Sequence, residues 1–443
     1  MSRLTVPPNF VGTSGIDTLA AEESNASVAI GIDILNQGVI NTFSGNDSIS
    51  GIGTSTDTGN LEPRKAGTGI GINNSGTLNA GNGNDSITGT GTGTGGNLPK
   101  IKGTLIIFSG AGSGTVGSNG TGISNSATLN AGSGNDTITG TGTGGTGDSG
   151  GSLTGKGGKG GTGIGISNSG SFDAGDGNDT ITGTGTGGTG GEGSVIGQTG
   201  SIPPSILRGE SGDGGAGIGI SNSDKLNTGK GEDTLIGTGT AGSNNKTGRK
   251  SSTGGTGIGI QNIKEAIITT GENTDTIKGS ATSLEANTLA YGIFNDGIID
   301  TGNGHDILTG QATTTIGGTA YGIYGQGIIR TGDGNDKVTA TSNIEKVQQK
   351  VTIGGGIHFE LGAGNDYFKG FGSAIVDGGN GFDTLDVRAF KRSDVSVSGV
   401  ISGNSVNPAN ITFNNNGNLI TLSTTGFENF IFADSSFSYS RLT

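Results

Sequence analysis

The residues in this sequence best placed to do chemistry are aspartates that follow glycine and asparagine in a recurring triplet. Carboxylates stacked in a row repel one another, and a hard divalent cation bound between neighbours would relieve that repulsion. Such a cation would also accept glycine carbonyl oxygens as ligands. The repeat therefore predicts Ca²⁺ at these turns. The Gly-Asn-Asp copies end at Asp47, Asp85, Asp136, Asp179, Asp336 and Asp366, and altered copies end at Asp233, Asp275, Asp306 and Asp383.

The same triplet has a second interpretation that involves no metal. Glycine and asparagine tolerate positive φ, and the side chains of asparagine and aspartate accept hydrogen bonds from nearby main-chain amides. Turn chemistry alone therefore selects the same residues, and both interpretations stay open at the sequence level.

The spacing of the aspartates indicates a repeat protein. From Asp17 to Asp383 the successive intervals are 30, 38, 51, 43, 54, 42, 31, 30, 30 and 17 residues. A basic unit of about 30 residues with inserts of variable length is typical of a solenoid. The inserts, such as 95–119 and 187–214, are rich in glycine and serine, and we expect flexible loops on one edge.

Each unit predicts three short strands separated by turns. In the clearest copy these are 69–72, 77–80 and 86–90, where apolar residues alternate with glycine, asparagine or threonine. Three strands and three corners per unit predict an all-β fold, a right-handed parallel β-helix whose coils bury their isoleucines only by stacking. We expect a lead-in or cap at 1–27, the solenoid at 28–386, and a small antiparallel cap at 387–443 that also serves as a possible secretion signal.

Composition narrows the possible partners. Among 443 residues there are 98 glycines and no cysteine, hydrophobic residues make up 28%, and the net charge is −13. An acidic surface disfavours nucleic acid and docking on anionic lipid, and it suits divalent cations. No signal peptide and no apolar span long enough to cross a membrane is visible in the sequence.

Two further rows of side chains follow from the expected register. Asparagines at the first corner would hydrogen-bond from coil to coil in an asparagine ladder similar to that of right-handed β-helix proteins such as pectate lyases. Threonines of the third strand would form a flat outward array, for example Thr88, Thr90 and Thr92, as in ice-binding solenoids; threonine is also simply a good strand residue. The asparagine row is expected at Asn36, Asn74, Asn125, Asn168, Asn222, Asn262 and Asn295, with a break at Gly325.

The aspartate turns resemble the calcium-binding nonapeptide G-G-x-G-x-D-x-U-x of the RTX (repeats-in-toxin) family, in which U is a large apolar residue. The stretch 378–386 matches at every position, and 361–369 lacks only the first glycine. Most units here carry a single copy, whereas the family places two copies in tandem. The resemblance therefore implies Ca²⁺ first in the C-terminal pair, at Gly362, Gly364, Asp366, Gly379, Gly381, Asp383 and Asp386.

The resemblance further implies secretion through a type I exporter by an uncleaved C-terminal signal, and an extracellular or cell-surface location. The leading hypothesis is a non-enzymatic, calcium-binding structural or adhesive scaffold whose partners include cell-surface polysaccharide or matrix. The alternatives are an ice- or glycan-binding solenoid that uses the threonine array, and a polysaccharide-active β-helix enzyme. Against an enzyme, the chain has two histidines, His305 and His358, and its carboxylates recur from unit to unit.

Overall fold

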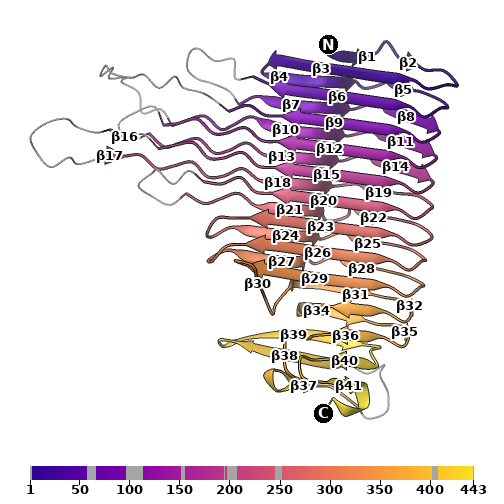
Figure 1. The fold of residues 1–443 in the computed structure, drawn as a ribbon, viewed down its shortest axis with the longest axis vertical. Helices are drawn as coiled ribbons and strands as arrows, with labels where there is room; N and C mark the ends of the chain where they lie inside the picture. The colour runs from indigo at the N-terminus through magenta and orange to yellow at the C-terminus, as the bar shows by residue number, and fades with distance from the viewer. Residues whose placement is uncertain are drawn as a thin grey trace, which may run out of the picture.

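The computed structural model shows a rod of stacked coils in which strands from successive repeats lie side by side (Figure 1). No helix among the residues it describes is long and apolar enough to cross a membrane. The structure describes residues 2–56, 66–95, 113–150, 155–193, 195–196, 207–244, 252–401 and 408–442.

The predicted fold class, a parallel β-solenoid with three strands per coil, is confirmed. In the third coil from the N-terminus these strands are β7 (Thr68–Asn74), β8 (Thr77–Asn82) and β9 (Ser86–Thr92). Each pairs in parallel with its equivalent in the coils above and below, with identical motifs in register.

The remaining solenoid strands fall into the same three classes. First strands are β4 (Val28–Ile34), β10 (Asn119–Asn125), β13 (Gly163–Asn168), β18 (Gly217–Asn222), β21 (Gly257–Asn262), β24 (Leu289–Asn295) and β27 (Thr319–Tyr324). The single strand β31 (Ile353–Glu360) takes both the first and the second position of its coil, because it pairs with β27 and with β28. Second strands are β5 (Val39–Asn41), β11 (Thr128–Ser133), β14 (Ser171–Asp176), β19 (Lys225–Asn227), β22 (Ile267–Thr269), β25 (Ile298–Asp300) and β28 (Ile328–Arg330). Third strands are β6 (Ser48–Ser55), β12 (Thr137–Thr143), β15 (Thr180–Thr186), β20 (Thr234–Thr240), β23 (Thr276–Ser283), β26 (Ile307–Thr314), β29 (Lys337–Ile344), β33 (Tyr367–Lys369) and β36 (Thr384–Asp386).

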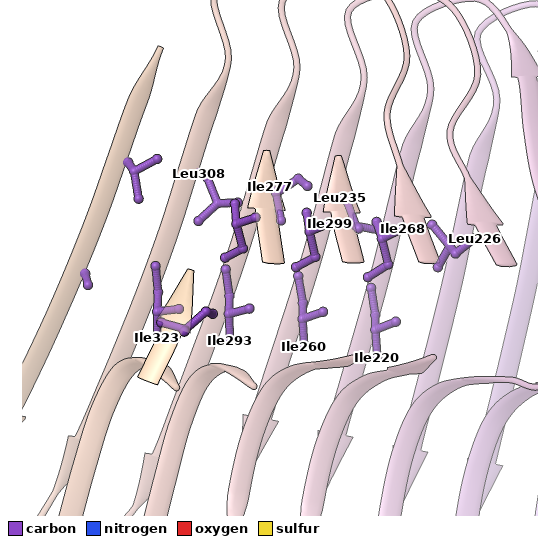
Figure 2. Close-up of a cluster of buried hydrophobic side chains, with 14 of the residues drawn as sticks. Ile220, Leu226, Leu235, Ile260, Ile268, Ile277, Ile293, Ile299, Leu308 and Ile323 are labelled. Atoms are coloured by element: carbon purple, nitrogen blue, oxygen red, sulfur yellow. The ribbon is translucent and has the colours of Figure 1, made fainter. Parts of the chain in front are cut away.

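The core is a narrow column to which each strand class contributes one apolar position per coil. Ile220, Leu226 and Leu235 supply one layer, and Ile260, Ile268 and Ile277 the next, all of them buried (Figure 2). Because each side chain stacks on its equivalent one strand spacing away, few large residues suffice to exclude water. This accounts for a stable fold at a low hydrophobic content.

Beyond this column the first and third strands meet backbone to backbone. A Cβ built on Gly142 of β12 would lie 2.0 Å from the carbonyl oxygen of Ile164 in β13. The alternating glycines are therefore required by close approach of two sheets, where any side chain would collide with main chain.

The inserts were expected as flexible loops, but the parts that the structure describes are extended rows tied together by main-chain hydrogen bonds. Gly145 N–H donates to Ser118 O, Gly161 N–H to Gly145 O, and Gly188 N–H to Gly161 O, at 2.7–2.8 Å. In 187–193 pairs of buried glycines alternate with a single half-buried residue, Thr189 or Glu192, and this three-residue period is typical of polyproline II chains. The rows extend the rod sideways without a side-chain core. The central parts of the inserts, such as 96–112, lie outside the described residues.

Both ends of the rod continue the sheets. The N-terminal strands β1 (Leu4–Val6), β2 (Phe10–Val11) and β3 (Thr18–Ala26) pair in parallel with β4, β5 and β6, so they form a coil of their own. At the other end β37 (Ser396–Ser398), β38 (Ala409–Asn415) and β39 (Asn418–Thr425) are antiparallel to one another. The remaining elements are β16 (Val195–Ile196), β17 (Leu207–Arg208), β30 (Val347–Gln348), β32 (Ala363–Gly364), β34 (Gly372–Asp377), β35 (Asn380–Gly381), β40 (Asn429–Ile431), β41 (Ser436–Ser438) and the 3₁₀ turns Arg392–Asp394 and Tyr439–Arg441.

Candidate functional site

The predicted aspartates form one continuous row along the rod, which we call the aspartate ladder. The main-chain N–H of Asp85 donates to Oδ1 of Asp136 in the following coil at 2.7 Å. Equivalent bonds of 2.7–2.8 Å connect every pair of neighbours in the series Asp17, Asp47, Asp85, Asp136, Asp179, Asp233, Asp275, Asp306, Asp336, Asp366 and Asp383.

The corner geometry explains why asparagine and aspartate stand next to each other. The N–H of Asn84 points to the preceding coil and donates to Asn46 Oδ1, whereas the N–H of Asp85 points to the following coil and donates to Asp136 Oδ1. The chain turns here, so side-chain oxygens replace the carbonyl acceptors that a continuing strand would provide. Asparagine Oδ1 and aspartate Oδ1 of the triplet are thus both used in joining coils.

From Asp47 to Asp383 each ladder aspartate is buried together with its second carboxylate oxygen, whereas Oδ2 of the half-buried Asp17 accepts from Thr13 N–H at 2.7 Å. Asp179 is 1% exposed, and its Oδ2 has no hydrogen-bond partner among the described residues. An exception is Asp233, whose Oδ2 accepts from Thr228 Oγ1 at 2.7 Å. The unpartnered Oδ2 atoms belong to Asp47, Asp85, Asp136, Asp179, Asp275, Asp306, Asp336, Asp366 and Asp383.

Burial of these groups makes their charged forms costly. Desolvation raises the pKa of Asp179 to about 7, and the charges of Asp136, Asp233 and Asp173 add to the effect, against the opposing hydrogen bond from the Asp136 amide. Desolvation likewise raises the pKa of Asp275 and Asp366 to about 7. These carboxyl groups therefore gain or lose a proton as the pH of the solution passes through neutrality.

The carboxylates of the ladder do not by themselves supply all the ligands that calcium requires. Ca²⁺ takes about six to eight oxygen ligands. Each corner offers one uncommitted carboxylate oxygen per coil, and the described residues contain no group of three or more acidic or histidine side chains suited to a metal ion. The carboxylates thus serve in main-chain capping and fit proton binding, and calcium at these turns remains a prediction from the sequence.

The C-terminal pair of turns, in which calcium was expected first, has the same geometry as the others. Gly362, Gly364, Gly379 and Gly381 all have positive φ, between 90° and 148°, and the two turns stack through the pairing of β32 with β35. Positive φ is the conformation for which glycine is needed.

Asp386, which the nonapeptide match groups with these turns, stands apart from the ladder on β36. It accepts hydrogen bonds from Arg388 and Tyr367. Burial acts to raise the pKa of Asp386, but these hydrogen bonds outweigh it and leave the pKa below its usual value. This carboxylate is an ion-pair partner within the fold.

Sequence reasoning missed the residue that ends the ladder. The N–H of Asp383 donates to Oε2 of Glu428, in the C-terminal cap, at 2.8 Å. Glu428 belongs to no repeat and has a different side-chain length, so no local signal marks it. The cap thus supplies the acceptor that a further coil would otherwise provide.

The asparagine ladder is present from Asn74 to Asn295. Each Nδ2 donates to Oδ1 of the next member at 2.7–2.9 Å. Asn36 was expected in this row, but Ile34 occupies the register position opposite Asn74, and Asn36 is exposed. The row ends as expected at Gly325. Asn295 Nδ2 donates to Ile328 O, as the other members donate to a carbonyl oxygen of the following coil, but it has no asparagine to donate to there.

The third strands carry the predicted threonine array on their outer surface. Thr139, Thr141 and Thr143 lie in register with equivalent threonines on both sides and are half-buried, while the glycines between them face inward. One column is threonine in seven successive coils: Thr54, Thr92, Thr143, Thr186, Thr240, Thr282 and Thr313.

No protein-family model matches this chain, and no curated protein is significantly similar to it in sequence.

Proposed function

We propose that this chain is a structural, adhesive scaffold of the cell surface or extracellular matrix. The observation that supports it is the unbroken sequence of coil-to-coil bonds from Asp17 to Glu428, in which the recurring aspartates hold the rod together. A site for catalysis concentrates its polar groups at one place, whereas here they recur along the axis.

Several features fit such a role. The rod exposes long, regular faces and carries a net charge of −13, which keeps a repetitive surface soluble and discourages self-association. Secretion by a type I exporter and contact with polysaccharide or matrix belong to this proposal, as does the resemblance of the C-terminal turns to RTX repeats.

Surface proteolysis of intact source cells tests the proposal. A protease added outside should cleave the protein while a cytoplasmic marker stays intact, and removal of the gene should reduce attachment of the cells to a polysaccharide-coated support. A protein found wholly inside intact cells would refute the proposed location and role.

A second candidate function is recognition of ice or a glycan by the threonine array. The seven-coil column from Thr54 to Thr313 favours it. Its hydroxyl and methyl groups repeat at the spacing of the strands, and such a regular, uncharged row can match a ligand surface that is itself regular and forms hydrogen bonds. The neighbouring columns are interrupted by Ile52, Ile236, Lys278 and Gln311, so all three columns carry threonine together only in β9, β12 and β15. An ice-recrystallisation assay with wild type and Thr141→Lys would detect the activity and its loss.

A further inference from the structure

A cavity opens on the third-strand face near the C-terminal end, where the strands become short. β29 spans eight residues, but its neighbour β33 spans three, so the sheet surface ends abruptly after Lys369. The resulting depression has a volume of about 290 Å³ and is lined by Lys337, Thr339, Tyr367 and Lys369.

The two lysines lie diagonally across this cavity. Lys337 is opposite Tyr367 in the strand register, and Thr339 is opposite Lys369. Neither lysine takes part in an ion pair within the described chain, although nearby Arg388 and Lys350 each have a carboxylate partner. Two unpaired positive charges at one cavity are unusual for a protein with a net charge of −13.

The other two lining residues, Tyr367 and Thr339, are uncharged. The Tyr367 hydroxyl donates to Asp386 and accepts from Arg388, which fixes the ring in the cavity wall, and Lys337 Nζ lies 5.9 Å from the ring centroid. Thr339 Oγ1 is buried and has no hydrogen-bond partner among the described residues. The cavity thus offers two cationic donors, a hydroxyl and an aromatic edge in a fixed arrangement.

We propose that this cavity binds the carboxylate or sulfate group of an acidic sugar unit, with the two lysines as donors to the anionic oxygens. Ammonium groups form charge-assisted hydrogen bonds with such oxygens, and the Thr339 hydroxyl and the Tyr367 ring suit the polar and apolar parts of a sugar. The volume is of the order of one such unit rather than of a folded partner. This inference names the class of molecule that the proposed scaffold binds, which is an acidic sugar. It depends on the scaffold proposal only for where that sugar comes from, the cell surface or matrix.

Titration of the purified full-length protein with D-glucuronate, followed by calorimetry or ligand-observed NMR at low ionic strength, tests this site. D-Glucose is the neutral control, since it differs mainly in lacking the carboxylate. We expect glucuronate to bind more tightly than glucose, and the double variant Lys337→Gln/Lys369→Gln to bind glucuronate about tenfold more weakly or worse, because charge-assisted hydrogen bonds are lost.

Lys278→Gln is the matched control variant, because Lys278 is an exposed lysine on the same face, two coils before β29 and outside the cavity. It should keep the affinity of the wild type, and all variants should keep the wild-type melting temperature. Equal binding of glucose, no binding of glucuronate, or an equal loss in Lys278→Gln would overturn the proposal.

Titration with inorganic sulfate tests whether the cavity recognises the sugar or only the anionic group. Tighter binding of glucuronate than of free sulfate supports recognition of the sugar, whereas equal binding would refute the sugar part and leave a simple oxyanion site. A negative result in these titrations leaves the scaffold proposal unaffected, because that proposal is tested by location and attachment in cells.

Discussion

Replacing a single buried carboxylate in the aspartate ladder should change how stability depends on pH. Asp179→Asn keeps an oxygen for the Asp136 amide and removes the charge that burial disfavours. The folded-state pKa of Asp179 is about 7, against an ordinary value of 3.8. The folded protein therefore binds the proton more tightly than the unfolded chain, and this group stabilises the fold more as pH falls from above 7 toward 4.

The magnitude follows from these values. Between pH 8 and pH 5 an aspartate with a folded pKa of about 7 takes up its proton mainly in the folded state, which adds about 3 kcal/mol to the unfolding free energy. Wild type should therefore gain about 3 kcal/mol more unfolding free energy than Asp179→Asn on acidification, and the variant should be the more stable protein at pH 8.

Denaturant unfolding followed by circular dichroism, at pH 8 and pH 5 in the presence of EGTA, measures both free energies. Asp176→Asn is the matched control, because Asp176 lies in the same corner but is exposed, and its substitution should leave the pH dependence unchanged. If Asp179→Asn is instead less stable than wild type by the same amount at both pH values, the carboxylate is neutralised by something other than a proton and the reasoning fails.

Three further predictions concern the ladders and the sheet contact. Gly142→Ala should unfold at much lower denaturant concentration, or fail to fold, since its Cβ would lie 2.0 Å from a carbonyl oxygen, whereas Gly15→Ala, whose Cβ meets nothing closer than 3.8 Å, should match wild type. Asn168→Ala should lower the unfolding free energy by about 3 kcal/mol in the same assay, because it leaves buried amide groups unsatisfied; a loss under about 0.5 kcal/mol would contradict the role of the asparagine ladder. Chelation of calcium by EGTA should leave the melting temperature unchanged at neutral pH; a clear rise on adding Ca²⁺, reversed by EGTA, would instead establish the calcium sites that the RTX resemblance implies.

Much of the fold could be predicted because its determinants are local. The alternation in Thr137–Thr143 places Ile138 inward and the threonines outward, and glycines at the Gly-Asn-Asp corners supply the positive φ that the turn needs. The near-identity of successive copies then implies stacking in register. The position of Asn36 was predicted wrongly because the first copy has a different spacing around its corner, and pattern matching alone cannot place such a residue.

The candidate site was predicted only in part. The row of aspartates follows from the repeat, but the use of Oδ1 by a main-chain amide and the isolation of Oδ2 depend on how coils approach each other in space. The contributions of Glu428 and of the cavity around Lys337 and Lys369 depend on contacts between segments that share no motif.

The sequence by itself determined the period, the inward and outward faces of each strand, and the corners, since these depend on the conformational preferences of adjacent residues. Only the tertiary structure decided what the corners do chemically. Burial, hydrogen-bond saturation and the proximity of charges are properties of stacked coils whose matching residues lie 17 to 54 positions apart in the chain, and no local pattern encodes the dielectric environment or the partner that each side chain meets there.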